Sequence, residues 1–179
     1  MACRAGNRPG FCILRDSPLP TKSSPTELTV TWQYSPFDEL TASELYAVMQ
    51  VRQRVFVVEQ QCPYLDADGS DHMALHLLGW RNTPDGLLLS AYARLFPPGA
   101  KYTEASIGRV LTHPAARGSG LGKALMVEAL ERIAEAEWGT AVRVAAQMYL
   151  EGFYEEFGFR RVSEPYTEDD IWHVDMLRD

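Results

Sequence analysis

Short apolar or alternating stretches recur along the chain and predict the strands of a sheet. Alternation of apolar and polar residues, often with β-branched side chains, is typical of strands that bury one face. The stretches with this character are residues 28–33, 76–81, 87–95, 106–112, 141–146, 159–162 and 171–176. Residues 83–86 read Thr-Pro-Asp-Gly, a turn sequence that joins the second and third of these strands in a predicted hairpin.

Three stretches with helical periodicity lie between the strands. The first follows a capping box at residues 41–44, Thr-Ala-Ser-Glu, and its apolar face runs to Phe56. Residues 52–61 either continue this helix or form a second short one. The other two helices are expected from Lys123 to about Trp138 and from Met148 to Phe157, the latter closed by Gly158.

Two acidic segments are predicted to be loops. Residues 62–71 contain D-x-D-G-x-D, which resembles the opening of a calcium-binding loop. Such a loop needs a bidentate glutamate at its twelfth position, and that position is Leu77 here. The pattern therefore favours aspartates that shape a turn through bonds to the backbone, and no metal site is predicted. Residues 164–170 are expected to form the second acidic loop.

Composition limits the domain count and the class of function. Residues 1–26 are rich in proline, arginine and serine without periodicity and are expected to form an irregular arm, so residues 27–179 form one domain. A net charge of −7 argues against a nucleic-acid partner. Three cysteines without paired spacing indicate free thiols in a reducing compartment, and no apolar run reaches the roughly 20 residues that cross a membrane. We expect a cytoplasmic protein.

A strand, a glycine-rich turn and a helix start follow one another at residues 106–129. Pro114 ends the strand because proline has no N–H to donate to a ladder. Glycines then precede the helix, where the first backbone N–H groups have no intrahelical partner and the helix dipole is positive. Such a turn binds anions, phosphates above all. The alternative is a glycine-rich turn without a ligand.

Two motifs resemble those of the GCN5-related N-acetyltransferase (GNAT) superfamily. Residues 107–126, IGRVLTHPAARGSGLGKALM, follow its V-x-P-x-x-R-x-x-G-x-G pattern, with Thr112 in place of the usual valine. Residues 153–159, FYEEFGF, match its tyrosine-bearing helix. Residues 51–71 and the HVDM at 173–176 are similar to the small bacterial ElaA-like branch. The resemblance covers about residues 28–178 and implies an α/β (α+β) fold. In that fold a mixed, mostly antiparallel sheet of about six or seven strands is splayed between its fourth and fifth strands and flanked by about four helices.

The resemblance also implies where acyl-CoA binds. The thioester carbonyl is expected on the backbone of Val110, Leu111 and Thr112. The pyrophosphate is expected on the turn formed by Arg117, Gly118, Ser119, Gly120, Leu121 and Gly122. Gln147 stands where many relatives have an asparagine that binds the pantetheine arm. Tyr154 matches the tyrosine that protonates the departing CoA thiolate, and its alternative role is that of a packing anchor.

The function that follows is acetyl transfer from acetyl-CoA to a primary amine by direct attack in a ternary complex. The strand position at which relatives carry a glutamate base is Val142 here, so the base must come from elsewhere. The replacements are Glu59, His173 and Asp175, each with a structural or solvent-facing role as its alternative. Arg52 and Arg94 are candidates for binding an acceptor carboxylate, with ordinary ion pairing equally open.

Two rival functions are weaker or remain open. A phosphate-loop nucleotide enzyme would need a hydroxyl residue after Lys123, and that residue is Ala124. A non-catalytic or regulatory CoA-binding module of the same fold remains an alternative, because the strand base is missing. The expected partner is a small-molecule or peptide amine, without nucleic acid, membrane or metal, and homodimer formation is left open.

Overall fold

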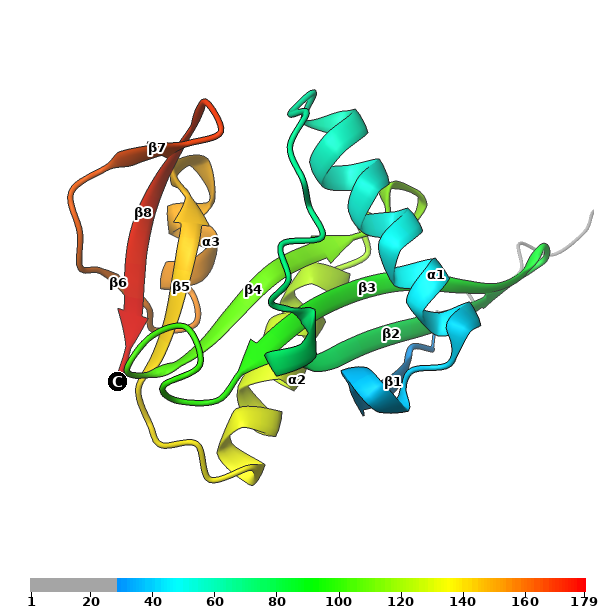
Figure 1. Ribbon diagram of the computed structural model, residues 1–179, viewed down its shortest axis with the longest axis horizontal. Helices are drawn as coiled ribbons and strands as arrows, with labels where there is room; N and C mark the ends of the chain where they lie inside the picture. The colour runs from blue at the N-terminus through cyan, green and yellow to red at the C-terminus, as the bar shows by residue number, and fades with distance from the viewer. Residues whose placement is uncertain (1–28) are drawn as a thin grey trace, which may run out of the picture.

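The computed structural model describes residues 29–179 (Figure 1). The predicted N-terminal arm, residues 1–26, and the first residue of the first predicted strand, Leu28, lie outside the described residues. No helix within residues 29–179 combines the length and the apolar character that crossing a membrane requires.

The described chain forms one mixed sheet of eight strands, ordered β1-β2-β3-β4-β5-β8-β6, with β7 also paired to β8. All neighbours are antiparallel except β4 and β5, which are parallel. The strands are β1 (Thr31–Pro36), β2 (Leu75–Thr83), β3 (Gly86–Phe96), β4 (Ala105–Thr112), β5 (Val142–Gln147), β6 (Arg160–Arg161), β7 (Tyr166–Glu168) and β8 (Ile171–Arg178). The mixed, mostly antiparallel sheet that the sequence predicts is thus confirmed. The eighth strand, β7, lies inside the acidic segment that was predicted to be a loop.

Three α-helices pack against this sheet: α1 (Ala42–Arg52), α2 (Leu121–Glu135) and α3 (Glu151–Glu155). The predicted capping box opens α1, because the Thr41 hydroxyl accepts the Glu44 N–H at 3.2 Å and the Glu44 carboxylate accepts the Thr41 N–H at 2.8 Å. Beyond α1 the chain continues directly as a π-helical segment, η2 (Gln53–Glu59), so residues 52–61 extend the helix to Glu59 in a wider form.

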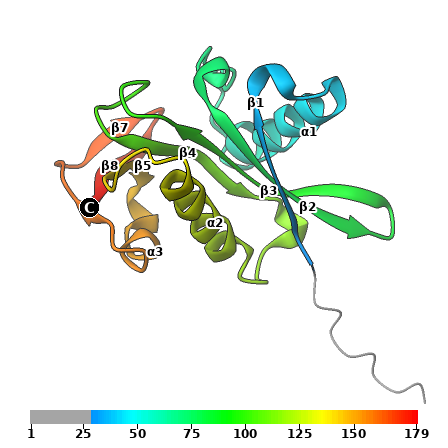
Figure 2. The same cartoon turned by 90° about the horizontal axis from the view of Figure 1, so that it is seen from below.

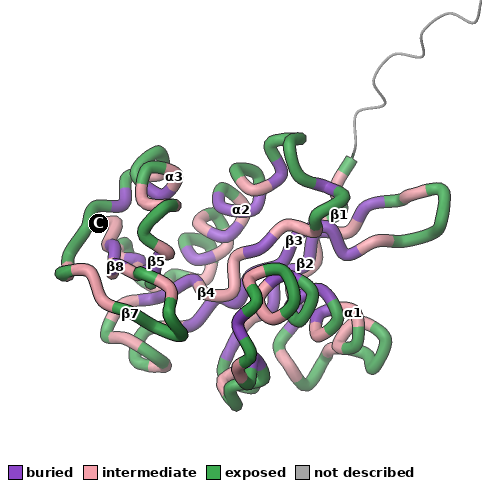
Figure 3. The backbone as a smooth tube through the Cα atoms, turned by 90° about the horizontal axis from the view of Figure 1, so that it is seen from above, coloured by how far each residue is buried: buried purple, intermediate pink, exposed green. Residues whose placement is uncertain are grey.

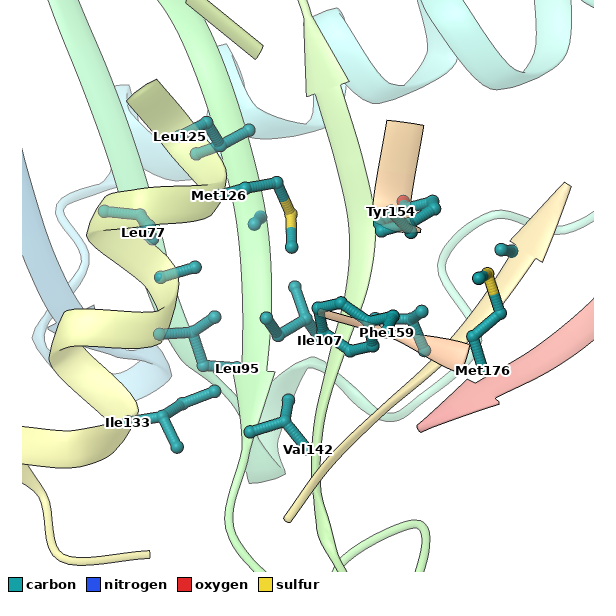
Figure 4. Packing of buried hydrophobic residues seen from close by; sticks show 14 of the residues in the cluster. Leu77, Leu95, Ile107, Leu125, Met126, Ile133, Val142, Tyr154, Phe159 and Met176 are labelled. Carbon is teal, nitrogen blue, oxygen red and sulfur yellow. The ribbon is translucent and has the colours of Figure 1, made fainter. Parts of the chain in front are cut away.

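The sheet has apolar side chains on both faces because neighbouring residues of a strand point in opposite directions. On β2, Leu77 belongs to the cluster that contains Leu125 and Ile133 of α2, whereas Leu78 belongs to the cluster that contains Val48 of α1. Figure 2 shows α1 and α2 on opposite sides of the sheet, and Figure 4 shows the α2 side chains against Leu77 and Leu95. Buried positions follow the central strands, and most exposed ones lie in turns and on outer helix faces (Figure 3).

The parallel pair β4 and β5 separates soon after it begins. The two strands pair only at Ala105 with Val142 and at Ser106 with Arg143. Beyond these pairs β4 continues along β3 and β5 continues along β8, and Figure 1 shows the two strands diverging. The splay between the fourth and fifth strands that the resemblance implied is therefore present, and it divides the sheet into a β1–β4 half and a β5–β8 half.

Candidate functional site

A cleft of about 410 Å³ lies where β4 and β5 diverge. It brings together residues from both halves of the sheet: η2 and the loop after it, β3, the β3–β4 loop, β4 and the turn after it, β5 with α3, and β7 with β8. The residues predicted for the site that line it are Glu59, Arg94, Val110, Leu111, Thr112, Arg117, Gln147, Tyr154 and His173. Arg52, the remaining residues of the glycine-rich turn and Asp175 are not among its lining residues.

The β4 edge of the cleft carries a bulge. Between the pairs Tyr92–Leu111 and Arg94–Gly108, β3 has one residue and β4 has two, Arg109 and Val110. Arg109 has a φ of 52°, in the left-handed region that a side chain disfavours. Because β5 has already diverged, the β5-facing backbone groups of residues 108–112 have no strand partner in the sheet. Unpaired backbone donors beside a cleft are suited to holding a carbonyl oxygen.

The glycine-rich turn has the backbone geometry of an anion site. Gly118 and Gly120 have φ values of 77° and 78°, and Gly120 is the N-cap of α2. A side chain would strain both positions, since only glycine adopts this conformation freely. Helix α2 begins at Leu121, directly after this turn. The exposed turn therefore lies at the N-terminus of a 15-residue helix, the end at which the helix dipole is positive.

Glu59 and Arg117 form an ion pair with each other. The Arg117 guanidinium donates to both carboxylate oxygens of Glu59, at 2.6 and 3.0 Å, and both side chains are about two-fifths exposed. The pair links the end of η2 to the turn after β4. The base role predicted for Glu59 and the pyrophosphate role predicted for Arg117 are therefore interdependent, because each side chain is the other's partner in this structure.

Gln147 at the end of β5 reaches across the cleft. Its side-chain N–H donates to Gln60 Oε1 at 3.3 Å, and its own Oε1 accepts from Gln60 Nε2 at 3.4 Å. The same oxygen accepts a hydrogen bond from the Tyr149 hydroxyl at 2.6 Å. Sequence reasoning found Gln147 but missed Gln60 and Tyr149, both of which line the cleft. Only their positions, directly after η2 and two residues after Gln147, could have signalled them.

Tyr154 of α3 lies at the apolar end of the cleft with 5% of its surface exposed. Its ring packs edge-on against Phe153 and Phe159, with centroids 5.2 and 5.9 Å away, and belongs to the α2-side core (Figure 4). Burial raises the pKa of Tyr154 well above its ordinary value, so the phenol keeps its proton at neutral pH. Tyr154 is thus a packing residue, and it also brings a protonated phenol to the cleft.

His173 on β8 faces the cleft. Its Nδ1 lies 2.9 Å from the Ile171 carbonyl oxygen, which can only accept, so in the neutral ring Nδ1 carries the proton and Nε2 keeps a free electron pair. The ring stacks on Tyr166 at 6.0 Å, and Tyr166 donates to Asp175 at 2.8 Å. Asp175 also accepts a hydrogen bond from Arg143, so its carboxylate is engaged in structural contacts. Of the β8 candidates for a base, only His173 therefore lines the cleft.

The aspartate-rich loop binds cations of the protein itself. We call this group the Asp-loop cluster: Arg52, Arg94, Lys101 and Arg109 with Asp66, Asp68 and Asp71. Within residues 29–179 there is no group of three or more histidine, cysteine or acidic side chains placed to hold a metal ion. The three aspartates thus face arginine and lysine side chains, and these bonds shape the turn.

The two arginines predicted to bind an acceptor belong to this cluster. The Arg52 side chain is fully buried, donates to Asp66 at 2.7 Å and to Asp71 at 2.5 Å, and does not line the cleft. Arg94 lines the cleft, but its guanidinium is 1% exposed and is committed to both oxygens of Asp68, at 2.8 and 2.9 Å. Ion pairing, the alternative that the sequence leaves open, thus engages both guanidinium groups.

Two carboxylates of the cluster, Asp66 and Asp68, stay ionised in spite of their partial burial. Burial acts to raise the pKa of Asp66, but the charges of Arg52 and Arg109 outweigh it and hold the pKa of that carboxyl below its usual value. At Asp68, burial is likewise outweighed, first by hydrogen bonds from Arg94 and the Ser70 N–H, and its pKa is lowered far below the usual range. Ionised carboxylates are needed to keep the buried guanidinium groups compensated.

Comparison with known proteins identifies the family. The model of the acetyltransferase (GNAT) domain matches residues 90–178. The protein ElaA of Escherichia coli (strain K12) is 41% identical over 152 residues, which are 84% of this chain and 97% of ElaA. The chain belongs to the GNAT family. The resemblance that its motifs indicate is confirmed, including the assignment to the ElaA-like branch.

Solved structures of this GNAT branch have the same fold. An acyl-CoA N-acyltransferase from Pseudomonas aeruginosa is 41% identical, with a TM-score of 0.78 over 84% of this chain and all of that one. The crystal structure of Escherichia coli ElaA is 40% identical, with a TM-score of 0.75 over the same shares. The GNAT fold class is therefore confirmed for this chain, which is a member of the acyl-CoA N-acyltransferase family.

The Asp-loop cluster generates a prediction about stability. Substitution Asp66→Asn removes the carboxylate that Arg52 and Arg109 each contact at 2.7 Å, leaving Arg52 with Asp71 and Arg109 with a 3.5 Å contact to Asp68. It is expected to lower the free energy of unfolding by about 3 kcal/mol at pH 7. Because the pKa of Asp66 is lowered in the folded protein, its contribution is present above the unfolded value of about 3.9 and is lost as pH falls below it. The difference between wild type and variant should therefore shrink in acid.

Urea unfolding at pH 7 and at decreasing pH measures this difference. Asp85→Asn, in the exposed hairpin turn, is the matched control and should change stability little at any pH. An Asp66→Asn protein as stable as wild type at pH 7 would contradict the role assigned to the cluster.

Proposed function

We propose that this GNAT protein transfers an acetyl group from acetyl-CoA to a primary amine of a small-molecule or peptide acceptor. The observation that carries the proposal is the cleft at the β4–β5 divergence, which gathers the β4 bulge, Arg117 and Tyr154 from three separate segments. Proteins of the GNAT family use acyl-CoA, and they act on small-molecule or peptide acceptors. The proposed location is the cytoplasm, which rests on the cysteine pattern of the sequence.

The proposed donor complex uses the two halves of the strand–turn–helix unit. The unpaired backbone of Val110 to Thr112 would hold the thioester carbonyl, and each such donor is worth about 2.7–4 kcal/mol in other acyl transfers. The pyrophosphate would lie on the turn from Arg117 to Gly122, where helix N–H groups and a guanidinium converge. In this assignment Arg117 would leave Glu59 and bind the phosphate, and Gln147 would leave Gln60 and bind the pantetheine arm.

The acceptor must be deprotonated before it attacks. An alkyl amine with a pKa of about 10.4 is neutral in roughly one molecule in 2,500 at pH 7, a deficit of about 4.6 kcal/mol. His173 is the proposed base, since its Nε2 holds a free electron pair in the neutral ring and faces the cleft. Glu59 is the second candidate, and both of its carboxylate oxygens accept hydrogen bonds from Arg117.

The amine nitrogen forms its bond to the acetyl carbon, and the thioester C–S bond breaks to release the CoA thiolate. Tyr154 would supply the proton for the sulfur, because its raised pKa keeps it protonated until that moment. Direct attack is favoured over an acylated cysteine. Burial, followed by the nearby Asp169 and Asp170 charges, raises the pKa of the Cys62 thiol and disfavours its nucleophilic form.

A CoA-binding module without catalysis is the second candidate. It is favoured by one observation: Val142 replaces the carboxylate base on β5, and no acidic side chain of β5 takes over that role.

Acetyl transfer is tested by following thiol release from acetyl-CoA against a panel of primary amines. We expect turnover in the wild type. In Tyr154→Phe we expect kcat to fall about 100-fold, the low end of the range for general acids, with little change in KM for acetyl-CoA. A thiolate with a pKa near 8.5 leaves passably without help, so activity is reduced and not abolished. Tight CoA binding without turnover on any amine would favour the module.

The identity of the base is tested by comparing His173→Gln with Glu59→Gln. If His173 is the base, its substitution should lower kcat/KM by about 10²-fold or more and change the acidic limb of the pH–rate profile. Glu59→Gln should keep that limb and should strengthen CoA binding by less than about fivefold, since an exposed pair contributes only about 0–1 kcal/mol. A pH profile altered by Glu59→Gln and unchanged by His173→Gln would reverse the assignment.

A further inference from the structure

The Asp-loop cluster contains more positive than negative charge. Four cationic side chains meet three carboxylates in it, and His76, the titratable neighbour that contacts Asp71, is kept neutral because burial lowers its pKa. This excess of one positive charge is partly buried, and an unpaired buried charge raises the free energy of the folded protein. An additional anion with a single charge would balance the group.

The shortage of negative charge is concentrated at Asp68. Its Oδ2 oxygen lies 2.9 Å from Arg94 Nη2, 3.5 Å from Arg109 Nη2 and 3.6 Å from Lys101 Nζ. Arg94 makes the short contacts, which leaves Lys101 with a long one. Burial is the largest influence on the pKa of Lys101 and lowers it. The contact with Asp68 therefore does not offset the loss of water around the ammonium.

Lys101 and Arg109 both line the cleft at the β4–β5 divergence. The Lys101 ammonium lies 5.1 Å from the centre of the Phe96 ring, and its side chain is 33% exposed. Arg109 lies over Phe56 and Tyr64 and directly precedes Val110, the first residue of the edge proposed to hold the acyl group. The two cations are therefore available from within the cleft, on its β1–β4 half.

The other half of the cleft is acidic. Glu168 and Asp169, at the turn between β7 and β8, line it together with His173. Figure 1 shows β7 and β8 across the divergence from β4. Contact of the Cys62 thiol with the Asp169 carbonyl, at 3.5 Å, brings this turn close to the aspartate-rich loop. In this part of the cleft Lys101 and Arg109 thus lie beside β4, and Glu168, Asp169 and the proposed base lie beside β8. Glu59, the acid on the η2 side, is paired with Arg117.

We propose that the acceptor is an amino acid or a short peptide with a free carboxylate, and that Lys101, assisted by Arg109, binds that carboxylate. The acceptor would enter as a zwitterion. Its ammonium would face Glu168, Asp169 and His173, which takes the proton, and its carboxylate would complete the Asp-loop cluster. This assignment of an acceptor rests on the proposed acetyl transfer. A carboxylate fits better than a phosphate dianion because the excess charge to be balanced is one.

Binding is measured separately from turnover so that the two proposals can fail independently. Leucine and glycylleucine, each compared with its C-terminal amide, are titrated by calorimetry onto the protein in complex with CoA. The proteins are wild type, Lys101→Met, Lys101→Arg and Arg160→Met. Arg160 is an exposed residue of β6 that pairs with Asp179, and its variant is the control for loss of a positive charge. CoA affinity and the melting temperature report that each variant is folded.

We expect wild type to bind each carboxylate about tenfold or more tightly than its amide, as a charge-assisted bond implies. Lys101→Met should lose this preference, whereas Lys101→Arg and Arg160→Met should retain it. In thiol-release assays Lys101→Met should raise KM for the carboxylates more than KM for the amides, and Arg160→Met should change neither. No preference in wild type, or a preference that survives Lys101→Met, would overturn the proposal. Preserved preference in wild type without turnover on any amine would support the carboxylate site and refute the acetyl transfer.

Discussion

The loss of pairing between β4 and β5 is the constraint on which the rest of this molecule depends. Two parallel strands in the middle of a sheet would normally pair along their length, but these two pair at only two positions. Each half keeps its order through other partners, β4 through β3 and β5 through β8. The backbone groups left between them need other partners, and a ligand with a carbonyl and an extended polar arm can supply these.

The two halves of the sheet bring different chemistry to this gap. The β1–β4 half carries the bulge at Arg109 and the Asp-loop cluster, in which buried arginines hold residues 62–71 against the strands. The β5–β8 half carries Tyr154, His173 and the acidic turn. The cluster has a structural part, Arg52 with Asp66 and Asp71, and a part that faces the cleft, Arg109 and Lys101. One network can therefore stabilise the fold and shape the acceptor side of the site.

Much of the fold could be predicted because its signals are local. The Thr41–Glu44 capping box, the Thr-Pro-Asp-Gly hairpin turn and the glycines before α2 each act within a few residues. What could not be predicted depends on contacts distant in sequence. The strand β7 exists only through β8, to which a turn with Asp169 and Asp170 at positive φ connects it. The burial of Arg52 depends on carboxylates 14 and 19 residues later, and nothing near Arg52 announces them.

The central claim is that acyl-CoA lies in the β4–β5 divergence with its pyrophosphate on the turn before α2. Hydrogen exchange measured by mass spectrometry, with and without CoA, tests it most directly. The account predicts slower exchange of backbone amides in residues 108–122 and in the segment from Gln147 to Tyr154, with no change in the hairpin turn around Asp85. Unchanged exchange in residues 108–122, or protection confined to the α1 residues Tyr46, Met49 and Gln50 of a neighbouring hollow, would contradict it.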